Sequence, residues 1–132
     1  VIVATTDNIN KKYHFSIDER LDIINNSLFK DLKFNKKKIQ VVSFNNLTID
    51  LCKKYNAHAI IRGLRAVSDF EYEFQLAGMN KKLNSKIETM FLMSDVENQI
   101  ISSKFVKEIA SLGGNIDRFV TRYVVKMLKN KF

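Results

Sequence analysis

Residues 59–65 read AIIRGLR, an apolar run followed directly by two arginines. The β-branched first half is typical of a buried strand, and the second half is typical of the loop that leaves it. Arg62 and Arg65 can each bind a phosphate with a planar fork of donors, and Gly63 lets the backbone come close to that ligand. Alternatively, the arginines pair with acidic side chains on the next helix and only stabilise the surface. The candidates for such pairs are Asp69, Glu71 and Glu73.

Apolar runs of this kind alternate along the chain with longer segments of helical spacing. The predicted strands are Val1–Thr5, Ile39–Phe44, His58–Ile61 and Glu88–Met93. The predicted helices are Ile17–Leu28, Thr48–Tyr55, Phe70–Leu83, Ser103–Leu112 and Thr121–Lys131. Strand runs that are almost continuously apolar are typical of parallel strands covered by helices on both faces. The pattern therefore predicts an α/β fold with a doubly wound parallel sheet.

Two helix ends carry recognisable signals. Ser16 and Glu19 have the spacing of a capping box at the start of the first helix. Gly113-Gly114 separates the last two helical segments and is a natural helix stop. These signals fix the limits of the helices better than the apolar pattern alone.

Composition limits the class of protein. The chain has 132 residues, 45% of them apolar, which is enough for a single domain over residues 1–132. A net charge of +8 favours anionic partners. No apolar run approaches the roughly 20 residues that cross a bilayer, so no membrane partner is expected. Cys52 is the only cysteine, which excludes an intramolecular disulfide and fits the cytoplasm.

The loops that follow parallel strands emerge at one edge of a doubly wound sheet, where ligands bind. Lys11 follows the first predicted strand, and Arg62 and Arg65 follow the third. Ser102-Ser103 begins a helical segment whose free N–H groups could bind an anion, although plain helix capping explains these serines equally well. We therefore expect cations and hydroxyl groups to gather at this edge around a phosphorylated ligand.

A longer stretch around the arginines is similar to a known family. Residues 61–73 read IRGLRAVSDFEYE, followed by QLA at 75–77 and MN at 79–80. With FLM at 91–93 and ISS at 101–103, this pattern closely resembles bacterial phosphopantetheine adenylyltransferase, over essentially the whole chain. The resemblance implies a Rossmann-like nucleotidyltransferase fold.

The resemblance also implies a reaction. Members of that family join ATP to 4'-phosphopantetheine, with Mg²⁺, to give dephospho-coenzyme A and pyrophosphate in coenzyme A biosynthesis, typically as homohexamers. By position, Lys11 would hold phosphate in the reacting complex, Arg62 would bind the phosphate of phosphopantetheine, and Thr48 would lie on the pantetheine side. No protein residue is implied as a metal ligand. The implied ATP-binding residues are Gly63, Leu64, Arg65, Glu73, Asn98, Gln99, Ile100, Ile101, Ser102, Ser103 and Lys104.

Two positions depart from the family pattern. Lys104 stands where relatives commonly have a third hydroxyl residue. The family's Gly-His nucleotide signature, which lies in its first strand and helix, is absent from these residues. We therefore expect the chain to begin at the family's second strand, so that the strands at Val1 and at Ile61 lack a neighbour on one side. Such a chain would fold poorly and show weak or no turnover alone.

Two other functions remain open from the sequence. One is a different nucleotidyltransferase, such as a nicotinamide-mononucleotide adenylyltransferase or a cytidylyltransferase, although the run from Arg62 to Glu73 argues against both. The other is a non-catalytic remnant that uses its positive charge to bind nucleotides or polyanions. Nothing in the sequence indicates base-specific readout, so nucleic acid is not an expected partner.

Overall fold

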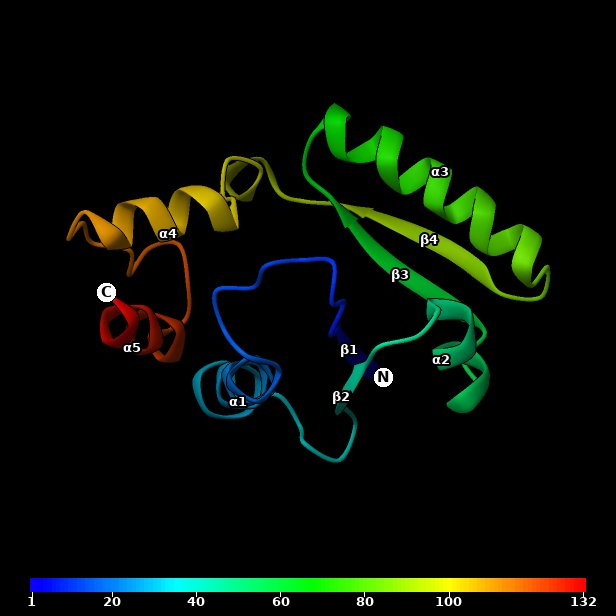
Figure 1. The fold of residues 1–132 in the computed structure, drawn as a ribbon, viewed down its shortest axis with the longest axis horizontal. Coiled ribbons are helices and arrows are strands. Elements are labelled where there is room, and N and C mark those ends of the chain that lie inside the picture. The colour runs from blue at the N-terminus through cyan, green and yellow to red at the C-terminus, as the bar shows by residue number, and fades with distance from the viewer. The chain divides into compact units, whose positions relative to one another are not determined.

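The computed structural model describes residues 1–132, apart from the side chains of residues 67 and 68. The fold is mixed α/β with parallel strands, as predicted (Figure 1). In chain order the elements are β1 (Ile2–Thr6), α1 (Ile17–Asn26), the π-helical turn η1 (Ser27–Asp31), β2 (Gln40–Phe44), α2 (Thr48–Lys54), β3 (Ala59–Leu64), α3 (Val67–Leu83), β4 (Glu88–Met93), the 3₁₀ turn η2 (Val96–Asn98), α4 (Ser103–Ser111) and α5 (Arg122–Lys131). Every predicted strand and helix is present, with shifts at the ends.

The chain divides into two compact units. Unit 1 consists of residues 1–45 and 101–132, and unit 2 consists of residues 46–100. In the described part of the chain the strands form two sheets of two strands each, β1 with β2 and β3 with β4. Both pairs are parallel, so each needs a helical crossover to return the chain to the same end.

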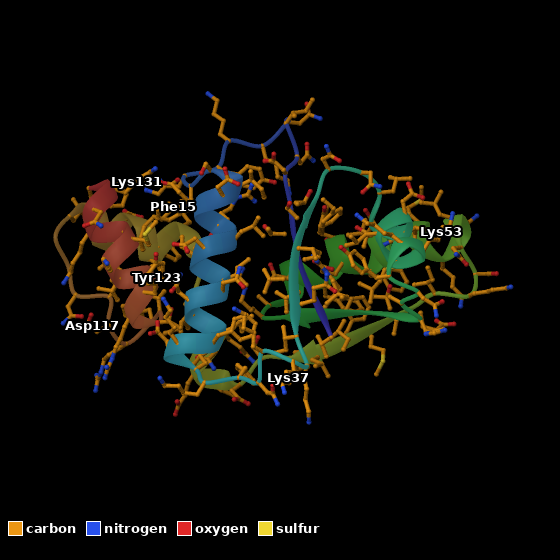
Figure 2. The ribbon with its side chains drawn as sticks, turned by 90° about the horizontal axis from the view of Figure 1, so that it is seen from below. Phe15, Lys37, Lys53, Asp117, Tyr123 and Lys131 are labelled. Atoms are coloured by element: carbon orange, nitrogen blue, oxygen red, sulfur yellow. The ribbon has the colours of Figure 1, made fainter. Side chains whose placement is uncertain are left out.

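Unit 1 is built from segments that are far apart in the sequence. Its core cluster contains Val106 from α4, Val125 and Leu128 from α5, and Ile116 from the loop between these helices. Phe15, which precedes α1, packs against the same cluster and lies near α5 in Figure 2. The burial of these apolar side chains is the main force that holds the two segments of unit 1 together.

Polar contacts join the same two segments. The Asp31 carboxylate accepts a hydrogen bond from the backbone N–H of Tyr123 at 2.8 Å, which places a negative charge at the start of α5. The Tyr123 hydroxyl donates to Asp22, and this bond raises the pKa of Tyr123 above its ordinary value. Lys131 donates to both carboxylate oxygens of Glu19. That ion pair, together with the bond from Ser16 N–H, lowers the pKa of Glu19.

Both predicted helix-end signals are confirmed. Ser16 and Glu19 form a reciprocal capping box at the start of α1. At the end of α4, Gly113 N–H donates to the Ala110 carbonyl and Gly114 N–H donates to the Ile109 carbonyl, which is the Schellman pattern. Gly113 has a φ of 78°, a conformation that a side chain would oppose. The glycine pair therefore ends α4 as the sequence predicts.

Unit 2 packs α2 and α3 against one face of the β3–β4 sheet. Its buried cluster contains Ile49 and Cys52 from α2 together with Ile87, and Ile60 of β3 packs against it. Burial raises the pKa of the Cys52 thiol, so this cysteine is a packing residue with little thiolate character. In Figure 1, α3 runs alongside β3 and β4.

Among the described residues of unit 2, no helix packs on the opposite face of the β3–β4 sheet. Ile61 is paired in register with Met90, and the two side chains are 62% and 54% exposed. Leu92 lies on the same face and is 58% exposed. Within unit 2, α2 and α3 lie on the same side of this sheet, so the helices of this unit cover one of its faces. Among the described residues, no helix combines the length and apolar character needed to cross a membrane.

Candidate functional site

Arg62 lies inside strand β3 and not in the loop after it. The structure extends β3 to Leu64, so Arg62 and Gly63 pair in register with Phe91 and Leu92 of β4. The prediction that the strand ends at Ile61 is wrong at this point, because the ladder with β4 continues through the glycine. As side chains alternate along a strand, Arg62 shares a face with Ile60, toward α2 and α3. The backbone of β3 thus fixes the position of the arginine.

The Arg62 side chain lines a small cavity between the sheet and its covering helices. The cavity has a volume of about 20 Å³, enough for about one water molecule. Thr48 at the start of α2 lies on it, as does Glu73 of α3. The remaining lining residues are Ile60, Leu76, Ala77, Asn80 and Thr89. The structure therefore brings together Thr48, Arg62 and Glu73, three of the site residues predicted from the sequence.

Arg62 and Glu73 form a bidentate ion pair. The Nε and Nη2 atoms of Arg62 donate to the two carboxylate oxygens of Glu73, at 2.8 and 2.6 Å. Glu73 is 9% exposed, whereas the Arg62 side chain remains 45% exposed. The bonds to Glu73 raise the pKa of the guanidinium above its already high ordinary value, so Arg62 is charged throughout the physiological range. The arginine is anchored by Glu73 through Nε and Nη2, and its side chain is still partly exposed to solvent.

The second arginine is also paired with an acidic residue. The Nε atom of Arg65 lies 3.3 Å from a carboxylate oxygen of Asp69, one turn along the chain at the start of α3. Both side chains are about one-third exposed or more. An exposed pair of this kind contributes about 0–1 kcal/mol to stability. A phosphate ligand could therefore compete with Asp69 for Arg65.

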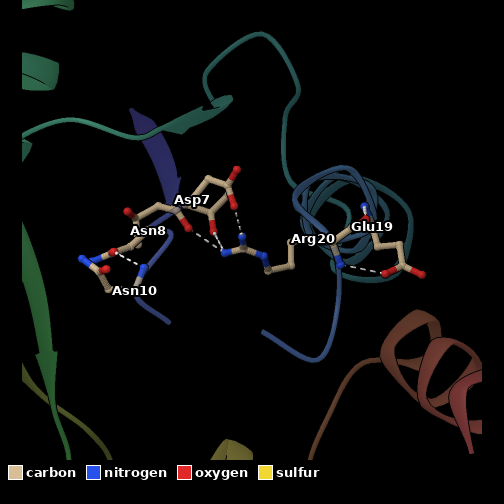
Figure 3. A network of polar contacts seen from close by, with 8 residues as sticks. Asp7, Asn8, Asn10, Glu19 and Arg20 are labelled. Carbon is tan, nitrogen blue, oxygen red and sulfur yellow. Dashed lines mark hydrogen bonds and ion pairs between the residues drawn. The ribbon is translucent and has the colours of Figure 1, made fainter. Parts of the chain in front are cut away.

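The loop that carries Lys11 is organised by Arg20, the fourth residue of α1. The Arg20 guanidinium donates to the Thr5 hydroxyl, the Thr6 carbonyl and the Asp7 carboxylate, at 3.2, 2.7 and 3.2 Å. Figure 3 shows Arg20 reaching from α1 to Asp7. The same guanidinium lies 3.8 Å from the centre of the Tyr13 ring. Its contacts fix both the end of β1 and the return of the loop to α1. Lys11 itself is exposed in this loop, and its backbone N–H bonds to the Asn8 carbonyl.

The predicted nucleotide loop from Asn98 to Lys104 spans the boundary between the two units. Its residues up to Ile100 belong to unit 2, and the rest belong to unit 1. Gln99 donates from its side chain to the Ser94 carbonyl. The Ser102 hydroxyl accepts from Phe105 N–H at 3.3 Å and caps α4, so the capping explanation holds for this serine. Ser103 and Lys104 form the first turn of α4.

A larger cavity, of about 450 Å³, lies in unit 1 at the amino ends of β1 and β2. Lys36, Lys37 and Lys38 line it, together with Asn25 and Phe29. Ligands of parallel α/β sheets bind beyond the carboxyl ends of the strands, which is the end that carries Lys11. We therefore do not assign the candidate site to this cavity, despite its size.

Two residues of these surroundings were missed from the sequence. Arg20 places a cation in the first turn of a helix, against the helix dipole, which indicates that it needs a specific partner. Asn80 is 9% exposed and lies on the same face of α3 as Glu73, seven residues later. Two polar residues seven positions apart lie on the same face of a helix. On a helix that covers a sheet, this spacing is the signal that could have identified Asn80 together with Glu73.

Parallel strands, helical crossovers and an arginine near the carboxyl end of a strand are typical of α/β proteins that bind phosphorylated ligands. Residues 1–109 match the model of the Cytidylyltransferase-like family, which is of this class. The chain is 64% identical, over its whole length and 80% of the relative's length, to phosphopantetheine adenylyltransferase of Pelagibacter ubique. It belongs to the phosphopantetheine adenylyltransferase family.

More distant relatives with the same name extend the match. The chain is 49% identical to phosphopantetheine adenylyltransferase of Dictyoglomus thermophilum, over all of its residues and 77% of that protein. It is 48% identical to phosphopantetheine adenylyltransferase of Sphingopyxis alaskensis, over 96% of its residues and 73% of that protein. The sequence resemblance to this family is thus confirmed.

Proposed function

We propose that this protein transfers the adenylyl group of ATP to 4'-phosphopantetheine, giving dephospho-coenzyme A and pyrophosphate in coenzyme A biosynthesis. The observation that carries the proposal, beside the family, is the shared position of Thr48 and Arg62 on one cavity of unit 2. Both residues are expected on the phosphopantetheine side of the reaction. The Arg62 side chain is 45% exposed, and a guanidinium can donate to a phosphate through an edge that Glu73 does not use.

The chemistry needs no nucleophile from the protein. A phosphate oxygen of phosphopantetheine attacks the α-phosphorus of ATP, the new P–O bond forms, and the bond to pyrophosphate breaks. Catalysis then comes from alignment and from neutralising negative charge. Arg62 would hold the attacking phosphate, Lys11 would bind phosphate in the reacting complex, and the start of α4 at Ser102 and Ser103 would face the triphosphate.

The nucleotide side of the proposal uses the remaining residues selected from the sequence. Gly63, Leu64 and Arg65 follow Arg62 on β3 and the loop after it, and Asn98 to Lys104 form the second segment. We propose that Mg²⁺ arrives with ATP, bound mainly by phosphate oxygens. Among the described residues, no group of three or more His, Cys, Asp or Glu side chains is placed to bind a metal ion.

Pyrophosphate release tests the proposal directly. The full-length protein is incubated with ATP and either 4'-phosphopantetheine or nicotinamide mononucleotide as the acceptor. We expect release with phosphopantetheine and none above background with nicotinamide mononucleotide. Release with nicotinamide mononucleotide alone would assign the protein to the other nucleotidyltransferase. Release with neither acceptor would favour a binding protein.

A variant of Gly63 tests the close approach of ATP to β3. No atom outside the chain neighbours lies within 4 Å of a Cβ built on Gly63, so Gly63→Ala should leave the melting temperature nearly unchanged. We expect weaker ATP binding by calorimetry, because the added methyl group would occupy the space that the nucleotide needs. Gly78→Ala is the matched control, since a Cβ there also meets nothing within 4 Å. If the ATP affinity of Gly63→Ala is unchanged, Gly63 does not belong to the ATP-binding site.

We further propose a homo-oligomer, with the hexamer of the family as the expected state. Helix α3 carries three large apolar side chains that are exposed, which supports self-association. Phe74, Met79 and Leu83 are 63%, 61% and 53% exposed. An apolar surface of this kind on a helix is typical of an interface. Light scattering by the full-length protein measures the state.

The proposed location is the cytoplasm. Cys52 is a free, buried thiol, and it is the only cysteine of the sequence. This cysteine usage fits a reducing compartment. ATP, the proposed substrate, is also an expected solute of that compartment.

A further inference from the structure

We infer that Arg20 is a positioning residue, which fixes the loop that carries Lys11 so that this lysine meets phosphate in the reacting complex. The inference rests on the proposed function and deepens it, because Lys11 is proposed there as a phosphate ligand. The contacts of Arg20 in the folded chain carry the argument.

The loop that carries Lys11 contains a turn closed by its own hydrogen bonds. Lys11 N–H donates to the Asn8 carbonyl at 3.0 Å, and Asn10 N–H donates to the Asn8 side chain at 2.9 Å. Neither bond attaches the turn to a strand or a helix, and Ile9 within it is 96% exposed. The position of Lys11 therefore depends on how the two ends of this turn are attached to the rest of unit 1.

Arg20 contacts the chain on both sides of this turn. Before the turn, its Nη2 atom donates to the Asp7 carboxylate at 3.2 Å, as Figure 3 shows. After the turn, its guanidinium lies 3.8 Å from the centre of the Tyr13 ring. A charge-assisted hydrogen bond and a cation over an aromatic face are both attractive contacts. One planar group thus holds both ends of the turn, with Lys11 between them.

The same guanidinium is bonded to the strand that precedes the loop. Its Nη1 atom donates to the Thr6 carbonyl at 2.7 Å and to the Thr5 hydroxyl at 3.2 Å. Both residues lie at the end of β1, at the edge where parallel sheets bind ligands. The Arg20 side chain is only 15% exposed, so water and salt screen these contacts less than they screen a surface pair. Arg20 therefore joins the loop to the end of the sheet.

The helix that carries Arg20 is itself firmly held. Arg20 N–H donates to the Ser16 carbonyl, and Glu19 beside it closes the capping box and pairs with Lys131 of α5. A cation in the first turn opposes the helix dipole. The Nε atom of Arg20 is also buried without an acceptor among the described residues, which is a further cost. The contacts with the loop explain this arginine better than the stability of α1 does.

The position of the loop matters because a lysine ammonium is a compact charge on a flexible stem. The backbone at Lys11 decides which phosphate oxygens the ammonium can reach. A loop that moves freely would still attract an anion, but it would seldom hold the anion in line for transfer. Arg20 is therefore expected to act on kcat more than on the KM of either substrate.

The decisive variant is Arg20→Gln in the full-length protein. We expect kcat for pyrophosphate release from ATP and 4'-phosphopantetheine to fall about tenfold or more, as when supporting residues are lost at metal sites. Both KM values should change by less than about threefold. Arg122→Gln makes the same change in the first turn of α5, at an exposed site, and should behave as the wild type. An unchanged kcat in a folded Arg20→Gln protein would overturn the inference and leave Arg20 a purely structural role.

A double variant separates positioning from an independent contribution. In a Lys11→Met background there is no ammonium to position, so Arg20→Gln should add no further loss of kcat. A full multiplicative loss would show that Arg20 acts without Lys11 and would overturn the inference. If Arg20→Gln does not fold, Asp7→Asn replaces it, because it weakens only one contact of Arg20 with the loop. A smaller loss of kcat is then expected, and an unchanged kcat would count against the inference.

Limited proteolysis measures the loop without relying on the reaction. Trypsin cleaves after lysine, so mass spectrometry can follow cleavage after Lys11 and Lys12 in the folded protein. We expect faster cleavage there in Arg20→Gln and the wild-type rate in Arg122→Gln. Equal rates in Arg20→Gln and the wild type would refute the attachment of the loop by Arg20. Absent pyrophosphate release in the wild type would instead be a failure of the proposed function, so the two failures are distinguishable.

Discussion

Arg62→Ala is expected to reduce pyrophosphate release from ATP and 4'-phosphopantetheine by about 10²- to 10³-fold, as the loss of a preorganised donor does at other transferring sites. The side chain is expected to hold the attacking phosphate, so both its binding and its alignment are lost. Arg62→Lys keeps the charge but loses the planar fork, and we expect it to fall between the wild type and the alanine variant. Steady-state kinetics with each substrate varied in turn measures the effect.

The same substitution should also affect stability. Removing the guanidinium leaves the Glu73 carboxylate buried without its partner, which costs about 1–3 kcal/mol for an unsatisfied polar group. We expect the lower part of this interval, because the arginine is 45% exposed and the pair is partly screened by water. Thermal melting separates this loss from the kinetic one. If a folded Arg62→Ala protein has a normal KM and kcat for phosphopantetheine, the Arg62–Glu73 pair only stabilises the surface and has no role in the reaction.

Ile116→Ala is expected to destabilise unit 1 by about 2–5 kcal/mol, the usual cost of truncating a buried isoleucine to alanine. Ile116 is 2% exposed and lies in the cluster of Val106, Val125 and Leu128. Urea denaturation of the full-length protein, followed by circular dichroism, measures the change. Ile9→Ala is the matched control, since Ile9 is 96% exposed and its truncation should cost nearly nothing. If the two variants unfold at the same urea concentration, Ile116 is not a main contributor to the core of unit 1.

The periodic parts of the fold could be predicted from the sequence, and the parts set by distant contacts could not. Strand β4 has the predicted bounds, and the capping box and the glycine pair end their helices as expected. The end of β3 differs because pairing with β4 continues past the apolar run through Gly63. Asp31 at the start of α5 is another such case, because its partner is far along the chain. Local patterns carry no information on these partners.

The candidate site could also be predicted only in part from the sequence. Arg62, Thr48 and Glu73 could be selected from the sequence, and the structure brings them to one cavity. The bidentate pairing of Arg62 with Glu73 was only one of three acidic alternatives, because sequence spacing does not say which helix face meets the strand. Arg20 was missed because its partners lie on the strand and loop before it, and its position in a first turn, against the helix dipole, is a weak local signal that does not name those partners.

The two-stranded sheets have a consequence for handling the protein. In the described residues every strand has one side along which its backbone groups pair with no other strand. Natural edge strands are often protected by lysine or proline, but β1 reads IVATT and has neither. The unpaired side of β1 is therefore open to a strand of a second molecule, which is the contact that begins edge-to-edge aggregation.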